Sequence, residues 1–275
     1  MRLATVLLDG TPTPGLLSPD HSAIFPLEAW PDTVAFLASG AHAPERSQDP
    51  ANYVAFERIL APIAHPPKLL CIGLNYRDHA IESNMELPKT PVVFTKFSNS
   101  IVGPGDTVVL PAASAQPDYE AELAIVIGKR GRNIAATDWR EYVFGYTIIN
   151  DVSARDIQLA TSQWSLGKSF DTFCPMGPAI VSLDEIGDPH ALSIQLSIDG
   201  VLLQDSNTDQ LVFDTGYLVA YLSSIMTLTP GDIISTGTPA GVGLGRTPKR
   251  WIQPGETMSI TIQNIGTLTN PTAAE

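Results

Sequence analysis

The stretch DYEAELAIVIG, residues Asp118–Gly128, decides both the fold class and the candidate site. Successive side chains of a strand point to opposite faces, so Glu120 and Glu122 would share one face, roughly 6.6 Å apart along the strand. That face continues through Ala124 and Val126, which are small or apolar. The two carboxylates are therefore predicted to point into a partly buried concavity. There they repel each other unless a cation or protons compensate.

Short apolar runs of the same kind recur on both sides of this stretch. Each is bounded by Gly, Pro, Asn or Asp, as strands often are. One helix is predicted between Asp214 and Pro230, because hydrophobic residues recur there at helical spacing. The sequence thus predicts an α+β fold that is mainly β. The eight candidate strands are KLLCIG, PVVFTK, DTVVLP, ELAIVIG, YTIINDV, LSIQLSIDG, DIISTG and MSITIQNIG.

The N-terminal region differs from this β-rich pattern. It begins with an apolar strand at residues 3–8, and helical stretches are predicted near residues 32–37 and 53–60. Pro62, Pro66 and Pro67 follow; they favour extended backbone and indicate a boundary. We predict a small α/β cap at residues 1–66 and a larger domain with the candidate site at residues 67–275.

Composition and charge exclude several classes of protein. The chain is 44% hydrophobic and 16% charged, which is typical of a compact globular fold. Its formal net charge of −13 would repel nucleic acid and anionic membranes, so neither is an expected partner. Cys71 and Cys174 show no disulfide or metal pattern and are predicted to be reduced. No signal peptide and no run of ~18 apolar residues is found, so we expect a cytoplasmic protein.

A third carboxylate, Asp151, ends the run YTIIND, where its side chain could lean over the end of a neighbouring strand. Three oxygen ligands without a His or Cys cluster favour a hard cation, Mg²⁺ or Mn²⁺, with Ca²⁺ as a further alternative. A solvated strand edge with a turn aspartate would give the same pattern. The spacing alone leaves both interpretations open.

Two further segments carry residues suited to catalysis. In NYRDHAIE, His79 and Glu82 lie three residues apart and would be neighbours on a helical turn. A carboxylate there can orient the imidazole as a general base. Lys168, in LGKSFDT, is flanked by small residues that permit close approach. Taken alone, this pair and this lysine are equally typical of a protein surface.

Together these segments resemble the fumarylacetoacetate hydrolase superfamily, over about residues 68–270. The resemblance implies a homodimer and a β-roll or barrel-like core of mixed sheet, with a small N-terminal cap. Five blocks in family order carry it: GLNYRDHAIES at 73–83, DYEAEL at 118–123, NDVSARDIQ at 150–158, GKSFDTFCPMGP at 167–178 and PGDIISTGTPAGVG at 230–243.

The resemblance also implies roles for individual residues. The family's additional, more N-terminal aspartate ligand has no counterpart in this chain, so water or substrate would complete the metal shell. Carried over residue by residue, the family assigns metal ligands at Glu120, Glu122 and Asp151, catalytic groups at His79, Glu82 and Lys168, and substrate contacts at Arg77, Gln158, Thr172 and Thr238.

The activity implied first is hydrolysis of a C–C bond in an acylpyruvate or related 2,4-dioxo acid, with a metal-stabilised enolate as leaving group. The segments SNTDQLVF and GLGRTPKRWIQPGE are similar to relatives assigned to oxaloacetate tautomerisation, and also to sugar-derived diketo-acid hydrolases. Keto–enol tautomerisation or decarboxylation of oxaloacetate are therefore alternatives at the same site. A catalytically silent metal-binding protein is the alternative from another class.

Overall fold

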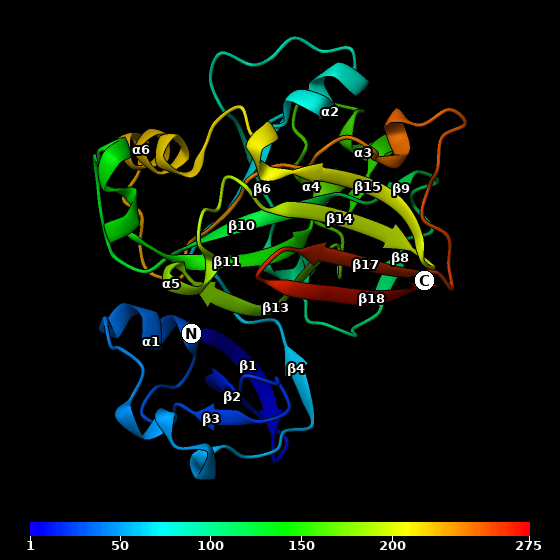
Figure 1. Cartoon of the computed structure of the whole chain (residues 1–275). Coiled ribbons are helices and arrows are strands. Elements are labelled where there is room, and N and C mark those ends of the chain that lie inside the picture. The colour runs from blue at the N-terminus through cyan, green and yellow to red at the C-terminus, as the bar shows by residue number, and fades with distance from the viewer.

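The computed structural model describes residues 1–275, and an eleven-stranded sheet is its largest element (Figure 1). Its strands are β1 (Arg2–Leu8), β2 (Thr11–Leu17), β3 (Ile24–Pro26), β4 (Arg58–Leu60), β5 (Leu69–Gly73), β6 (Val92–Thr95), β7 (Ile101–Val102), β10 (Ala121–Ile127), β11 (Val143–Asn150), β13 (Cys174–Ser182) and β16 (Ile233–Ser235). They follow the order β3-β2-β1-β13-β11-β10-β16-β5-β6, with β4 beside β1 and β7 beside β13.

A second, five-stranded sheet packs against the first. Its strands are β8 (Val108–Leu110), β14 (Ser193–Ile198), β15 (Val201–Asn207), β17 (Thr257–Ile262) and β18 (Gly266–Ala274), in the order β15-β14-β17-β18-β8. A small pair, β9 (Pro117–Asp118) and β12 (Ser153–Ala154), lies beside the candidate site. The α+β, mainly β fold predicted from the sequence is confirmed.

Strand β10 is buried on both faces, and this burial fixes where its acidic residues lie. Leu123 and Ile125 belong to a core of 35 buried residues that the two sheets share. Ala124 and Val126 belong to a second core of 17 residues, which includes side chains of the N-terminal region. The predicted apolar continuation of the face that carries Glu122 is therefore confirmed.

Helices are short and lie at the ends of strands. In α6 the carboxylate of Asp214 accepts a hydrogen bond from Tyr217 N, and Leu218 and Leu222 are buried, as the helical spacing predicted. None of the helices combines the length and the hydrophobicity that a membrane-spanning helix needs. The α-helices are α1 (Thr33–Ser39), α2 (Arg77–Glu82), α3 (Arg155–Gln158), α4 (Ser165–Lys168), α5 (Leu183–Ile186) and α6 (Thr215–Ile225). The 3₁₀ turns are η1 (Glu45–Gln48), η2 (Pro50–Asn52), η3 (Ser98–Ser100), η4 (Ala136–Glu141), η5 (Thr208–Gln210) and η6 (Gly243–Gly245).

The N-terminal strands continue the large sheet, because β1 pairs with β13 in the register Leu3↔Ile180. Figure 1 shows this region at one end of the molecule. The helix predicted at residues 53–60 is wrong: β4 forms instead and pairs with β1, as in Thr5↔Leu60. Sheet pairing here overrides a weak local preference. The division into residues 1–66 and 67–275 stays a prediction.

Candidate active site

Two neighbouring strands bring the three predicted carboxylates together. Glu122 lies on β10, Glu120 directly precedes this strand, and Asp151 directly follows β11. The strands are antiparallel, with Glu122 opposite Ile149, so the start of one meets the end of the other. One oxygen from each carboxylate lies within 4.8 Å of the others, and all three side chains are buried. The interpretation as a solvated strand edge does not hold.

Buried cations compensate two of these three carboxylates. Lys168 Nζ donates to Glu120 Oε2 at 2.7 Å and to Asp151 Oδ2 at 2.8 Å. Lys96 Nζ, also buried, donates to Asp151 Oδ1 at 2.7 Å. Burial lowers the pKa of Lys168, but Asp151 and Glu120 outweigh it and raise the pKa overall. Lys168 is therefore a charged group on the floor of the site.

Arg155 is the third buried cation of the cluster. Its Nε donates to Asp118 Oδ2 at 2.8 Å, and its Nη1 donates to Gln158 Oε1 at 3.0 Å. Its Nη2 lies 2.6 Å from Glu120 Oε1 and forms an ion pair with it. Arg155 thus joins Asp118 to Glu120, and its charge is held in place.

Glu122 is the one carboxylate of the cluster that forms no ion pair. The Ser235 hydroxyl and Gly237 N both donate to its Oε2. Burial, followed by the charges of Asp151 and Glu120, raises the pKa of Glu122 from 4.5 to about 8. A group that is so poorly compensated fits a site for a cation.

Glu120 shows the opposite balance. Burial acts to raise its pKa, but Arg155 and then Lys168 outweigh burial and hold the pKa at about 2. Four buried carboxylates, Asp118, Glu120, Glu122 and Asp151, therefore face three buried cations, Lys96, Arg155 and Lys168. The donor set fits a divalent cation bound through carboxylate oxygens, because Glu122 can release its proton and supply a fourth negative charge when a cation binds.

The predicted His–Glu pair forms on α2. His79 Nδ1 lies 3.3 Å from Glu82 Oε2. The other carboxylate oxygen of Glu82 accepts a hydrogen bond from Gly241 N at 2.9 Å. Both oxygens of Glu82 are therefore fixed, and the imidazole is oriented by a side chain that is itself held in place.

A cavity of about 460 Å³ joins the His–Glu pair to the charged cluster. Carboxylates and cations of the charged cluster form its floor, and its walls include Phe94, Leu159 and Trp164. Nζ of Lys168 lies 5.1 Å from the centroid of the Phe94 ring. Of the ten residues assigned from the family resemblance, the structure places seven along this cavity: His79, Glu82, Glu120, Glu122, Gln158, Lys168 and Thr238.

The structure does not bring Arg77 and Thr172 to this cavity. Arg77 is exposed on the outer side of α2, where it donates to Asp209 O at 3.0 Å. Thr172 has a φ of +68° in the turn before β13, and its hydroxyl accepts a hydrogen bond from Val109 N. This turn aims its side chain at a separate hollow near the C-terminus. Asp151 lies beneath the cavity, bound to Lys96 and Lys168.

Lys96, Arg155 and Asp118 were not assigned a role from the sequence. Charge balance could have identified Lys96 and Arg155, because three buried carboxylates require cations nearby. Lys96 follows the apolar run PVVFT, and Arg155 lies within the block NDVSARDIQ. Asp118 opens the block DYEAEL, which drew attention only to its two glutamates.

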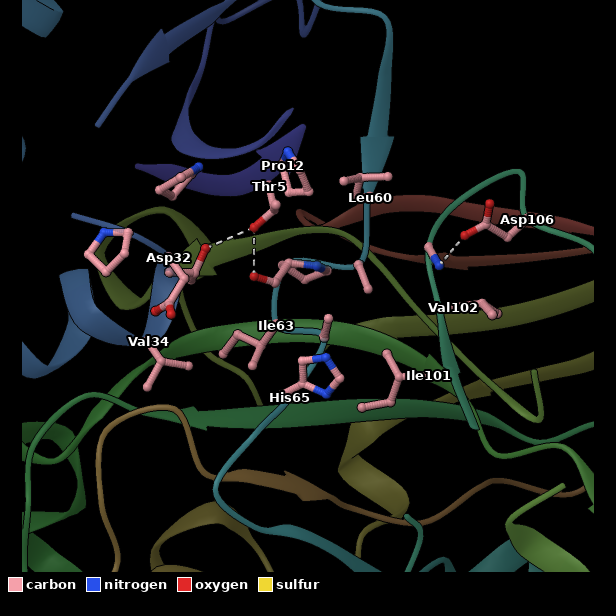
Figure 2. Close-up of a pocket in the computed structure, with 17 residues that line it drawn as sticks. Thr5, Pro12, Asp32, Val34, Leu60, Ile63, His65, Ile101, Val102 and Asp106 are labelled. Carbon is pink, nitrogen blue, oxygen red and sulfur yellow. Dashed lines mark hydrogen bonds between the residues drawn. The ribbon is translucent and has the colours of Figure 1, made fainter. Parts of the chain in front are cut away.

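A second cavity, of about 330 Å³, lies where the N-terminal region meets the large sheet (Figure 2). Pro12, Leu60, Ile63 and Ile101 contribute much of its lining. The hydroxyl of Thr5 lies 3.0 Å from Thr33 Oγ1 and donates to Pro62 O at 3.0 Å. No cluster of buried charges lies here, so the candidate chemistry belongs to the other cavity.

The sequence is similar to a known family over most of its length. The sequence model of the family described as "Fumarylacetoacetate (FAA) hydrolase C-terminal" matches residues 68–273. The Xenopus laevis protein named oxaloacetate tautomerase fahd2, mitochondrial, is 44% identical over 98% of this chain and 90% of its own length. A mitochondrial location is part of that protein's name, and the cytoplasmic location expected for this chain stays a prediction.

Two solved structures share the whole fold. Fumarylacetoacetate hydrolase from Exiguobacterium antarcticum superposes with a TM-score of 0.89 and 35% identity, over 100% of both chains. Maleylpyruvate hydrolase from Sphingobium sp. SYK-6, solved with manganese(II) and pyruvate, gives a TM-score of 0.81 and 31% identity, over 100% of this chain and 99% of that one. The buried carboxylates are thus consistent with a divalent metal site.

Proposed function

Because the chain belongs to the fumarylacetoacetate hydrolase family, we propose that it is a metal-dependent tautomerase that interconverts the keto and enol forms of oxaloacetate. One observation carries this proposal: His79, held by Glu82, shares a cavity with a buried carboxylate cluster that lacks a full set of cations. The name of the relative that matches almost the whole chain favours tautomerisation over the C–C hydrolysis that the sequence suggested first.

Glu120, Glu122 and Asp151 would hold Mg²⁺ or Mn²⁺, which both prefer oxygen ligands. The manganese in the structure of the maleylpyruvate hydrolase supports the second ion. When bound, a divalent cation stabilises negative charge that develops on a carbonyl oxygen nearby. Glu122 would gain the compensating charge that it otherwise lacks.

The cations of the floor would bind the carboxylate beside the 2-oxo group. Lys168 is charged, and both Lys168 and Arg155 line the cavity. Gln158 is fixed by Arg155, and the hydroxyl of Thr238 accepts a hydrogen bond from Gln204, so both border the cavity in defined positions. This arrangement would orient C3 of the substrate toward the imidazole.

The reaction needs only the movement of protons. One proton leaves C3, one is added to the oxygen on C2, and the C3–H electron pair becomes the C2–C3 double bond of the enol. With Nδ1 of His79 bound to Glu82, Nε2 is the nitrogen free to accept the C3 proton. No water is consumed, which separates this reaction from hydrolysis.

The test follows the absorbance of the enol form over time, with oxaloacetate and with acetylpyruvate in parallel. Each acid is assayed with protein treated with a chelator and with protein to which Mg²⁺ or Mn²⁺ is added. Metal-dependent acceleration of keto–enol exchange, without loss of CO₂, is the expected result. Loss of CO₂ from oxaloacetate would identify a decarboxylase. Absence of turnover on both acids, with a melting temperature that still rises on adding metal, would favour the catalytically silent metal-binding protein.

Hydrolysis of a C–C bond is the second candidate, since the structural relative in complex with manganese and pyruvate is named a hydrolase. The His79–Glu82 pair could also activate water for attack on a distal carbonyl. Pyruvate and acetate released from acetylpyruvate would establish this activity. Their absence, with rapid exchange of oxaloacetate, would exclude it.

We also propose a homodimer. Ile81, Met85 and Leu166 are 80%, 55% and 72% exposed, a high exposure for large apolar side chains. The cavity is bordered by Met85 itself and by Glu82, the neighbour of Ile81. Light scattering after gel filtration should give twice the mass of 29.4 kDa. A mass of one chain at micromolar concentration would contradict the dimer.

A further inference from the structure

Three lysines or arginines line the cavity of the candidate active site, and they differ in their partners. Arg155 and Lys168 form ion pairs with the buried carboxylates. Lys249 forms no ion pair and is exposed. Its Nζ lies 5.7 Å from the centroid of the Trp251 ring. The border of the cavity thus carries one cation whose charge is not compensated.

Hydrogen bonds tie the segment that carries Lys249 to the catalytic floor. Asp118, fully buried, accepts from Gly243 N at 2.7 Å and from Leu244 N at 3.0 Å. The same carboxylate binds Arg155. A Cβ added at Gly245 would come within 2.4 Å of the Glu82 side chain, so this segment packs directly on the His–Glu pair.

We propose that Lys249 binds the second carboxylate of a dicarboxylic 2-oxo acid and makes the site selective for such substrates; this inference rests on the proposed function. The floor cations would be occupied by the carboxylate next to the 2-oxo group. Arg155 and Lys168 are already paired with the buried carboxylates, and the cavity walls include the apolar side chains of Phe94, Leu159 and Trp164. A second carboxylate therefore has Lys249 as its partner, in a chain whose net charge of −13 otherwise repels it.

Asp118 acts as a positioning residue in this proposal. It fixes the guanidinium of Arg155 on one side and the backbone of residues 243–244 on the other. Asp118 therefore joins the floor of the cavity to the segment that leads to Lys249. A substrate with two carboxylates would contact both the floor and Lys249, whereas a monocarboxylate uses only the floor.

The test compares Lys249→Gln, Lys249→Arg and wild type in steady-state kinetics of tautomerisation. Oxaloacetate carries the second carboxylate, and acetylpyruvate is the 2-oxo acid that lacks it. For Lys249→Gln we expect KM for oxaloacetate to rise about fivefold, as for a solvent-exposed ion pair, with kcat and the KM for acetylpyruvate unchanged. Lys249→Arg should restore most of the affinity. Equal effects on both substrates, or none, would overturn the proposal.

Lys129→Gln is the control for the loss of one positive charge. Lys129 is exposed and does not line the cavity; its Nζ lies 3.6 Å from Glu141 Oε2, in an exposed ion pair, and 4.9 Å from the centroid of the Tyr142 ring. Lys129→Gln removes the same single positive charge as Lys249→Gln. An effect that comes only from long-range attraction of the substrate would therefore appear in both variants. The expected result is a KM for oxaloacetate equal to that of wild type. A rise equal to that of Lys249→Gln would overturn the assignment of a local contact.

Binding separates this inference from the proposed function. The Kd of each acid is measured by calorimetry with metal-loaded protein. The heat released by turnover of the acid is subtracted from the heat of binding. If wild type binds oxaloacetate more tightly than acetylpyruvate without accelerating exchange, the proposed function fails, and loss of that preference in Lys249→Gln still supports the inference. If wild type shows no preference for the dicarboxylate, the inference fails whatever the activity.

Discussion

Two cavities of the molecule, one of about 330 Å³ at the junction with the N-terminal region and one of about 460 Å³ above the carboxylates, differ in how their polar groups are satisfied. At the junction, Thr5 binds Thr33 and Pro62 O, and the remaining lining is largely apolar (Figure 2). Above the carboxylates, Glu122 is buried without a cation. Polar groups that satisfy one another indicate packing, whereas a buried carboxylate without a cation partner indicates a ligand site.

The largest expected effect is a loss of kcat on replacing the histidine of one cavity but not that of the other. His79→Gln should lower kcat for oxaloacetate tautomerisation about 10²–10⁴-fold, because it removes the general base. His65→Gln, in the junction cavity, should leave kcat unchanged. Circular dichroism of both variants checks that each is folded. Equal losses in the two variants would show that the base assignment is wrong.

The second effect is a pH dependence that belongs to the charged cavity alone. In metal-free protein the folded chain keeps a proton on Glu122 between pH 4.5 and about 8, while the unfolded chain releases it. The free energy of unfolding should therefore fall as pH rises through this window. Thermal melts with a chelator from pH 5 to pH 8 measure the slope.

Glu122→Gln is the variant that isolates this slope. It cannot ionise, so its melting temperature should vary less with pH over the same window. Added Mg²⁺ or Mn²⁺ should raise the melting temperature of wild type at pH 8 more than that of the variant. The same slope in both proteins would assign the titration to another group.

The third effect belongs to the junction. Ile63 is 3% exposed and packs in the second core. Ile63→Ala should lower the free energy of unfolding by about 2–5 kcal/mol, measured by urea denaturation. kcat/KM per folded molecule should be unchanged. A loss of activity as large as the one expected for His79→Gln would mean that the two cavities are coupled.

The smallest effect concerns a single hydrogen-bonding group. Thr5→Val removes the hydroxyl that joins Thr33 to Pro62 O while keeping the shape of the side chain. The expected loss is about 1 kcal/mol in the free energy of unfolding, and Thr5→Ser should recover part of it. A change in KM for oxaloacetate in Thr5→Val would contradict the structural role of the junction.

Local patterns predicted much of the fold, and the exceptions have physical causes. DYEAELAIVIG and YTIINDV formed buried strands because their apolar runs are continuous. Strand β13 escaped notice because Pro175, Gly177 and Pro178 interrupt its pattern, although it lies in the centre of the large sheet. Within residues 53–60, Arg58–Leu60 form strand β4 because β1 offers a partner that is distant in sequence.

In the candidate site, too, contacts within one segment could be predicted from the sequence, whereas contacts between distant segments could not. His79 and Glu82 are three residues apart, so their contact could be predicted from helical spacing. The cations Lys96, Arg155 and Lys168 come from separate segments, and only tertiary packing brings them to the carboxylates. Arg77 and Thr172 lie in matching blocks, yet an outward helical face and a left-handed turn keep them out of the cavity.

The most direct test of the central claim follows the C3 protons of oxaloacetate by proton NMR in D₂O, with metal-loaded wild type and with His79→Gln. Wild type is predicted to accelerate replacement of these protons by deuterium without forming pyruvate, and His79→Gln is predicted to match the rate without enzyme. Exchange at the rate without enzyme in wild type, or equal acceleration by His79→Gln, would contradict proton transfer by the imidazole in the charged cavity.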